Sequence, residues 1–326
     1  MPTTSDLPPW SVRLGRVAGT PVQVSASCLL VIAVIAVAFA PRARDLVPEL
    51  GGAAVLAGVA VGAAVYLAAL AHEAAHAVVA RRHGRDVAWI RISAGGGRTQ
   101  VRGRATTPAE LARIAAAGPV LSLAVGLLAL VARIAIGPGV VALVLEALVL
   151  ANLLIGLLDL LPAPPLDGGR LVHAWAWRVA GSRHRGAVVS AWVGRVTAGA
   201  VLAVVLAWAV ASTRPPRLTV WLVAGLLAAM IWLASEAQLT SSRVRERLAG
   251  TDVSHLVRPL TGPVVPGARR VTGPVSADDV LLVVQDDEPG TDAVLVVVDA
   301  DGVPTGTLRL SDVEHSGAFD AVRKRP

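Results

Sequence analysis

Six long apolar stretches constrain the fold of this chain more than any other feature of its sequence. A helix needs about 20 predominantly apolar residues to cross the hydrocarbon core of a bilayer. The stretches have roughly this length, although the first is short unless it borrows Pro21 to Val24; they are residues 25–40, 50–79, 111–136, 140–161, 187–210 and 218–238. Hydrophobic residues make up 54% of the chain and charged residues only 16%, which is outside the profile of a soluble globular protein. The sequence therefore predicts an α-helical polytopic membrane protein with about six transmembrane helices.

The arginines between these stretches are distributed unevenly between the two ends of the predicted helices. They are frequent before the first stretch and after the second, fourth and sixth, and sparser in the other loops. Because cytoplasmic loops carry an excess of Lys and Arg, this pattern predicts a multi-pass protein of the cell membrane with both termini in the cytoplasm. The formal net charge of +7 also comes from these arginines. Since the arginines do not cluster on one soluble face, we expect no nucleic-acid binding.

A short polar motif, His72-Glu73-Ala74-Ala75-His76, interrupts the second apolar stretch. On a helix, positions i and i+4 share one face, so both imidazoles can bind one metal ion while Glu73 faces a bound water. Ionisable side chains inside an apolar span are costly, and such a cluster indicates a functional site. One alternative is a set of polar residues that only face the interior of a helix bundle. Another is a metal transporter, although a transport path calls for polar residues spread over several spans.

The fourth apolar stretch supplies candidates for a third metal ligand. Asn152, Asp159 and Asp167 lie in it or just after it, and a segment rich in proline and glycine, 162–169, ends the helix. A tetrahedral zinc site that keeps one position open for water needs three protein ligands. A helix broken by proline and glycine can bring Asp167 to the metal. The alternative is a loop that simply leaves the membrane.

The segment between the second and third stretches has a different character. Residues 87–101 alternate in part between apolar and polar side chains and contain three consecutive glycines, 95–97. This pattern predicts a short strand and a glycine bend near the membrane surface. A phosphate-binding loop is the alternative, but neither a helix start at the required spacing nor a Gly-Lys-Ser/Thr sequence follows the glycines.

These motifs together resemble the site-2 protease family of intramembrane zinc metalloproteases. The resemblance covers most of the chain: Arg13-Leu14-Gly15-Arg16 with residues 19–24, the helix that carries His72 and His76, the glycine-rich segment, Ala117-Gly118-Pro119, and the Leu-Pro-x-x-Pro-Leu-Asp-Gly-Gly-Arg block at 161–170. It implies a cytoplasmic N-terminal segment over residues 1–24 and a six-helix transmembrane zinc protease domain over residues 25–240.

The resemblance also assigns roles to residues. It implies that His72, His76 and Asp167 bind one Zn²⁺ per chain and that Glu73 is the general base, which takes a proton from a water activated by the metal. The expected reaction is the regulated cleavage of a transmembrane or membrane-anchored protein, such as an anti-sigma factor, within the lipid bilayer.

One position departs from the family pattern. The family commonly has Asn eight residues before the ligand Asp, where its amide can donate a hydrogen bond to the substrate or the oxyanion, but this chain has Asp159 there. An ionised carboxylate donates no hydrogen bond. Asn152, two helical turns earlier on the same face, could partly replace the amide. The alternative function is therefore a zinc-binding relative that binds membrane helices without cleaving them.

Beyond about residue 250 the chain changes to a small α+β region. Residues 280–284 and 293–298 are β-like runs, and Asp299-Ala300-Asp301-Gly302 is typical of a hairpin turn. Residues 250–326 resemble a single, divergent CBS domain, which implies a cytoplasmic module with Asp312 at an adenine nucleotide. Since such modules work in pairs, this one could pair in a homodimer. The alternative is a plain α+β cap.

Overall fold

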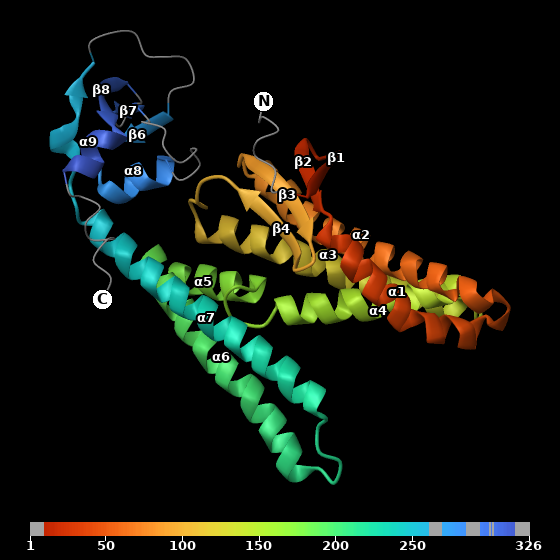
Figure 1. The fold of residues 1–326 in the computed structure, drawn as a ribbon. Helices are drawn as coiled ribbons and strands as arrows, with labels where there is room; N and C mark the ends of the chain where they lie inside the picture. The colour runs from red at the N-terminus through yellow and green to blue at the C-terminus, as the bar shows by residue number, and fades with distance from the viewer. Residues whose placement is uncertain (1–9, 261–268, 285–293, 300, 302, 317–326) are drawn as a thin grey trace. The chain divides into compact units, whose positions relative to one another are not determined.

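Six helices in the described part of this computed structural model are long and apolar enough to cross a membrane (Figure 1). The structure describes residues 10–260, 269–284, 294–299, 301 and 303–316. The six helices are α1 (Ser27–Leu46), α2 (Ala54–Arg82), α3 (Pro108–Ala135), α4 (Val140–Asp159), α6 (Arg183–Ala211) and α7 (Leu218–Ala249). A 3-10 turn, η2 (Pro48–Ala53), precedes α2, and the shorter α5 (Asp167–Ala180) follows α4. The prediction of an α-helical polytopic membrane fold is confirmed.

The first membrane helix lies further along the chain than the sequence predicts. Residues 21–24 do not complete the short stretch 25–40, because they belong to a strand, β2 (Thr20–Ser25), in which Val22 is buried. The helix instead gains length at its other end, continuing past Pro41 to Leu46. Prediction fails here because Val22 and Val24 alternate with a polar residue and pair with another strand, a contact between distant parts of the sequence.

Strand β2 is part of a four-stranded sheet in the order β1-β2-β3-β4. The other strands are β1 (Ser11–Val17), β3 (Val87–Ser93) and β4 (Gly96–Val101). The β1–β2 and β3–β4 pairs are antiparallel, whereas β2 and β3 are parallel. Ile90 and Ile92 of β3 are buried against Ala77 and Ala80 of α2, so the sheet covers the end of α2 that carries the polar motif.

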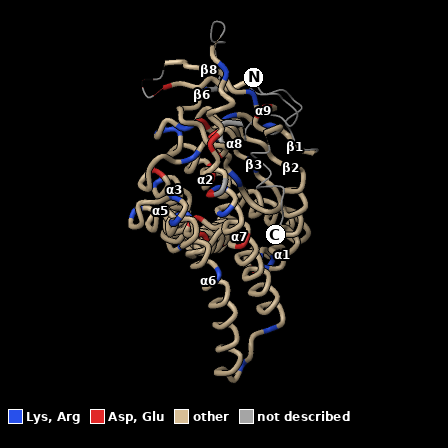
Figure 2. Tube along the Cα trace, turned by 90° about the vertical axis from the view of Figure 1, so that its left-hand side faces the viewer, with Lys and Arg blue, Asp and Glu red and all other residues tan. Residues whose placement is uncertain are grey.

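Small side chains let the membrane helices of the first compact unit, Met1–Ser235, approach one another closely. Alanines of α1, α2 and α4 form one buried cluster, and α3 packs along α4. Membrane helices associate mainly through such close packing. Apolar side chains are as favourably placed against lipid as against protein, so the hydrophobic effect does not drive the helices together. The large apolar side chains point outward, among them Leu29, Leu128, Val196 and Leu226, which are all exposed. In Figure 2, the parts of α6 and α7 next to the loop that joins them, residues 196–211 and 218–235, carry no charged positions, and charges return in that loop.

The second compact unit, Glu236–Pro326, holds a separate small α+β core. Its sheet has the order β5-β8-β7-β6, formed by β5 (Arg258–Pro259), β6 (Arg269–Thr272), β7 (Val294–Val298) and β8 (Pro304–Arg309). A 3-10 turn, η3 (Ser254–Leu256), and two short helices, α8 (Ala277–Val284) and α9 (Leu310–His315), complete it. The antiparallel β7–β8 pair forms the predicted hairpin, although Ala300 and Gly302 of its turn lie outside the described residues.

The β-like run at 280–284 is a wrong prediction, because these residues form the second half of α8. A short apolar run reads alike as a buried strand or a buried helix. A helix-start signal just before residues 280–284 explains why this run is helical. The backbone N–H and hydroxyl of Ser276 both donate to Asp279, whose own N–H donates to the Ser276 hydroxyl, an arrangement that satisfies the free donors of a helix N-terminus.

Candidate metal centre

Two buried imidazoles from α2 face each other inside the first unit. His72 and His76 lie one turn apart and are only 7% and 4% exposed. Their Nε2 atoms are 3.1 Å apart. This is the arrangement that the i, i+4 spacing predicts for two ligands of one ion.

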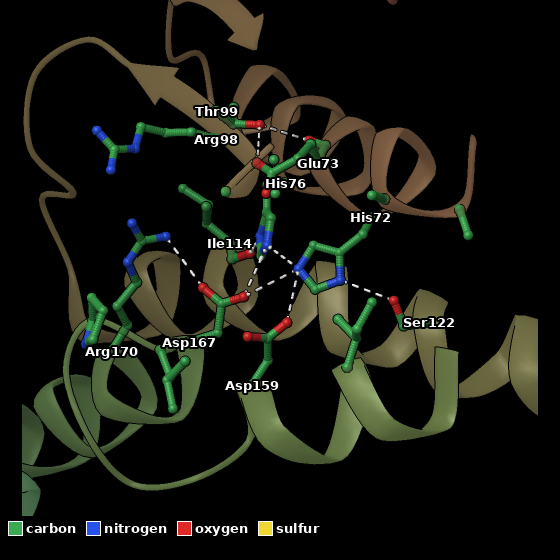
Figure 3. Close-up of a pocket in the computed structure, with 18 of the residues that line it drawn as sticks. His72, Glu73, His76, Arg98, Thr99, Ile114, Ser122, Asp159, Asp167 and Arg170 are labelled. Carbon is green, nitrogen blue, oxygen red and sulfur yellow. Dashed lines mark hydrogen bonds and ion pairs between the residues drawn. The ribbon is translucent and has the colours of Figure 1, made fainter. Parts of the chain in front are cut away.

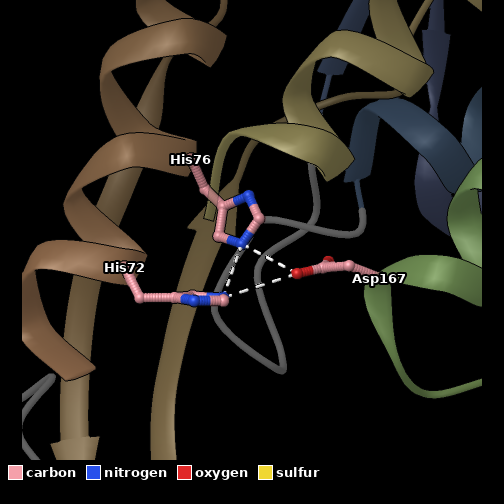
Figure 4. Close-up of side chains that lie close together, drawn as sticks. All are labelled: His72, His76 and Asp167. Carbon is pink, nitrogen blue, oxygen red and sulfur yellow. Dashed lines mark hydrogen bonds and ion pairs between the residues drawn. The ribbon is translucent and has the colours of Figure 1, made fainter. Parts of the chain in front are cut away.

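Asp167, the first residue of α5, completes a group of three possible ligands (Figures 3 and 4). Its Oδ2 lies 3.0 Å from Nε2 of His76 and 3.5 Å from Nε2 of His72. The irregular proline-rich segment between Asp159, the end of α4, and Asp167 brings this carboxylate to the histidines. All three ligand atoms lie within 4.8 Å of one another, so the structure brings together the three residues that the sequence singled out.

Gly118 of α3 leaves the space in which an ion would be held. A Cβ added there would lie 2.3 Å from Nε2 of both His72 and His76. Zinc binds imidazole nitrogen at about 2.0–2.1 Å, so a side chain at position 118 would crowd an ion at the two nitrogens, and glycine leaves open a cradle beside both rings. The residues present therefore fit a metal ion.

The outer ring nitrogens are held by two other positions of α3. Nδ1 of His76 donates to the backbone carbonyl of Ile114 at 2.7 Å, and Nδ1 of His72 lies 2.9 Å from the hydroxyl of Ser122. Because a carbonyl can only accept, His76 carries its proton on Nδ1 and turns the lone pair of Nε2 toward the ion. Ile114, Gly118 and Ser122 are spaced by four residues, so one face of α3 supports the whole centre.

Arg170 orients the Asp167 carboxylate. Its guanidinium donates to Oδ1 of Asp167 at 3.2 Å, while Oδ2 faces the imidazoles. Burial raises the pKa of Asp167, but the adjacent imidazoles and the charge of Arg170 more than offset this effect, and the resulting pKa lies well below the usual range. The carboxylate is therefore ionised, as a metal ligand must be.

Glu73 lies beside the centre and is held by the sheet. The hydroxyl of Thr99, on β4, donates to Oε2 of Glu73 at 2.6 Å and also approaches the backbone carbonyl of Glu73 at 3.0 Å. Gly97 permits this close approach, since a Cβ there would lie 2.4 Å from Cγ of Glu73. The glycine-rich segment thus forms a hairpin strand that fixes the acidic side chain of the motif, a role that the sequence did not reveal.

Asp159 and Asn152 differ in how they meet the centre. Oδ2 of Asp159 lies 3.6 Å from Nε2 of His72, so its carboxylate faces the ligands. The Asn152 amide is buried and donates to the carbonyl of Leu148 in its own helix at 2.9 Å, which uses one of its two N–H donors. Both residues line the pocket, but Asp159 is the one directed at the metal centre.

The centre opens into a pocket of about 600 Å³. Its walls come from α2, α3, α4, the segment around Asp167, strand β4 and Met230 of α7. This volume is in the range of small-ligand and peptide sites. This cavity between membrane helices gives a bound ion access to a substrate, as a catalytic metal site requires and a closed structural site does not.

Asp312, predicted at a nucleotide in the C-terminal unit, is engaged within the protein. Its carboxylate forms an ion pair with Arg258 of β5, with contacts of 2.9 and 3.0 Å. A ribose would have to compete with this guanidinium for the same oxygens.

Comparison with known proteins links the chain to metalloproteases. The family model described as Peptidase M50B-like matches residues 27–163. Rip3 of Mycobacterium tuberculosis strain H37Rv, which is named as a zinc metalloprotease, is 38% identical over 263 residues, covering 78% of this chain and 65% of Rip3. The protein sll0528 of Synechocystis sp. strain PCC 6803, also named as a zinc metalloprotease, is 28% identical over 191 residues, covering 57% of this chain and 49% of its own length. The chain thus spans less than two thirds of the relatives that it matches.

A solved structure also aligns with the chain. The Site-2 Protease from Methanocaldococcus jannaschii covers 71% of this chain and 95% of its own, with 20% identity and a TM-score of 0.46.

Proposed function

We propose that this chain is a member of the site-2 protease family and that it is an intramembrane zinc endopeptidase that cleaves a transmembrane or membrane-anchored protein; its similarity to the Peptidase M50B-like family and to Rip3 supports this proposal. The observation that carries this proposal is the convergence of His72, His76 and Asp167 on one cradle between membrane helices, with Glu73 in the same pocket. Buried ionisable groups at this depth are costly and are retained for function.

Zinc, when bound by His72, His76 and Asp167, supplies Lewis acidity toward the peptide carbonyl and toward an attacking water. The chain's own residues do the rest. Glu73 accepts a proton from the water as the water oxygen bonds to the carbonyl carbon, and it then gives that proton to the departing amine as the C–N bond breaks. Thr99 holds the carboxylate in one orientation for both transfers.

Strand β4 suggests how a substrate reaches the centre. It is an edge of the sheet, it contributes residues 96–101 to the pocket wall, and its Thr99 contacts Glu73. An exposed edge strand offers backbone donors and acceptors to an added extended segment. A helical substrate must first unwind, because its carbonyls are otherwise hydrogen-bonded within the helix. We therefore propose that the cleaved segment binds in extended form along β4.

Asp159 supports a second candidate function, a relative that binds zinc without cleaving peptide bonds. Its carboxylate lies 3.6 Å from Nε2 of His72, where the family commonly has an amide donor. A negative charge at this place would repel a developing oxyanion instead of stabilising it. Both candidate functions include zinc binding, so only a measurement of cleavage distinguishes the protease from the non-cleaving relative.

We also propose where the protein lies and which kind of protein it cleaves. The arginine distribution supports a position in the cell membrane with both termini in the cytoplasm, and the family supports a regulator, such as an anti-sigma factor, as the substrate. An adenine nucleotide in the C-terminal unit has no support from Asp312, whose carboxylate is paired with Arg258, and pairing of that unit in a homodimer rests on the resemblance alone.

The experiment that tests the proposal compares membrane-protein fragments in cells that carry the wild type, Glu73→Gln or Glu49→Gln. Glu49 is exposed in η2 and makes a matched control for the charge change. We expect an uncut precursor to accumulate only with Glu73→Gln, while the purified variant keeps its zinc. Equal fragment patterns in all three strains would favour the non-cleaving candidate, and unchanged cleavage of an identified substrate by Glu73→Gln would refute the role of Glu73.

A further inference from the structure

Arg98 is a cation at the wall of the metal-site pocket. It lies on β4, the edge strand, its side chain is exposed, and it lines the pocket together with Glu73 and Asp167. Figure 3 shows its side chain extending from the strand on the opposite side from His72. Successive side chains of a strand point to opposite faces. Since Thr99 is directed at Glu73, its neighbour Arg98 is directed at the other face of the sheet.

The residue directly across from Arg98 on β3 is another cation. Arg91 pairs with Arg98 in the β3–β4 register, and like charges placed opposite each other destabilise a sheet. Arg91 is satisfied locally, because it donates twice to the side-chain oxygen of Gln23, at 3.0 and 2.8 Å, and lies 4.1 Å above the ring of Trp89. Burial, followed by the charge of Arg98, lowers the pKa of Arg91. Arg91 therefore raises the positive electrostatic potential at Arg98 and does not neutralise the charge of Arg98.

No carboxylate within the described residues forms a hydrogen bond or ion pair with Arg98. The other guanidinium of the pocket wall, Arg170, is already engaged with Asp167. The acidic groups of the centre are committed as well, Asp167 to the imidazoles and Glu73 to Thr99. Arg98 is thus a positive charge on the strand next to the reacting groups whose partner the described part of the chain does not supply.

We infer that Arg98 selects substrates carrying an Asp or Glu side chain within about three residues of the cleaved bond, by forming an ion pair with it. The inference rests on the proposed protease function, since it takes the segment bound along β4 to be the substrate. A strand added to β4 places a side chain about 5 Å from that of Arg98. Because Arg98 and Thr99 are adjacent, this side chain belongs to a residue next to the one that faces Glu73.

The test uses synthetic transmembrane peptides that differ only in having Glu, Gln or Lys at one position near a central helix break. The full-length protein, in phosphatidylcholine vesicles, is compared with Arg98→Glu, Arg98→Gln and Arg16→Glu. Arg16 is exposed on β1, at the opposite edge of the same sheet, so its variant controls for net charge. Since exposed ion pairs are weak, we expect kcat/KM of the wild type to favour Glu over Lys by about threefold to tenfold. Arg98→Gln should abolish this preference, Arg98→Glu should reverse it, and Arg16→Glu should leave it unchanged.

Photo-cross-linking to the same peptides gives a readout that does not need cleavage. Carried out in the Glu73→Gln background, it should show the same order, Glu above Gln above Lys, and the same reversal with Arg98→Glu. If cross-linking shows this order but the wild type cuts no peptide, the charge selection holds and the protease proposal fails. If substitutions of Arg98 do not change the order in which the peptides cross-link, the inference is overturned whether or not peptides are cut. A preference that vanishes in the presence of phosphatidylglycerol would also overturn it, because an anionic lipid headgroup would then be the partner of Arg98.

Discussion

Replacing Gly118 with Ala should abolish metal binding while leaving the protein folded. The added methyl carbon would lie 2.3 Å from Nε2 of both histidines, whereas ordinary contacts begin at 3.4 Å. Each ring would have to retreat by about 1.1 Å, and zinc sites tolerate deviations of only about 0.2 Å in their ligand distances. We therefore expect a loss of zinc affinity of more than about a hundredfold, beyond the range seen when only the orientation of a ligand is disturbed.

The assay is the zinc content of the purified protein, measured by atomic emission, together with competition against a chromophoric chelator. Gly199→Ala is the matched control, because Gly199 lies within α6 and an added Cβ there meets no atom within 4 Å. We expect about one zinc per chain in the wild type and the control, and close to none in Gly118→Ala. Circular dichroism and gel filtration in detergent should show all three proteins to be folded. A folded Gly118→Ala protein that binds zinc as tightly as the control would refute the location of the cradle.

Three further substitutions separate the roles of residues around the centre. Thr99→Val should lower kcat by roughly tenfold to a hundredfold, since a hydrogen bond to a charged group is worth about 1.5–3 kcal/mol, whereas zinc content should not change and Thr99→Ser should restore turnover. Ser122→Ala should weaken zinc binding by about 10–100-fold in a chelator competition, because Nδ1 of His72 loses its partner; unchanged affinity would show that another group holds that ring. Asp159→Asn should raise kcat at constant zinc content, by about tenfold or more, because the amide can donate a hydrogen bond where the carboxylate repels negative charge. A fall in activity with that variant would instead give Asp159 a useful role.

The parts of the fold that depend on local composition could be predicted from the sequence. Long apolar stretches located the six membrane helices, because bilayer thickness fixes their length. The errors lie where pairing between distant segments decides the structure. Residues 21–24 belong to a strand because β3, more than sixty residues later, pairs with them. Residues 280–284 are helical because of a capping interaction at Ser276.

In the candidate site, too, the residues of a local pattern could be predicted, whereas those that act through contacts between distant segments could not. His72, Glu73 and His76 form a local pattern on one helix, and Asp167 stands out because a proline break precedes it. The supporting groups carry no such signal. Ile114 acts through its backbone carbonyl, Gly118 through the absence of a side chain, and Thr99 through its register in a hairpin. Only the spacing of four residues between positions 114, 118 and 122 of α3 could have pointed to a common face.

The division of the ligands between α2 and α5 has a consequence for how the protein is made. His76 and Asp167 are 91 residues apart, which at ordinary translation rates of about 5–20 residues per second separates their synthesis by roughly 5–18 s. During that interval His72 and His76 lack their third ligand, Asp167. An 18-residue window of the span Pro48–Arg82, which carries these histidines, has a mean hydropathy of 2.2, which favours insertion without the completed site. The metal centre therefore cannot be complete until Asp167 has been made, so binding of an ion by all three ligands comes after the synthesis of α2.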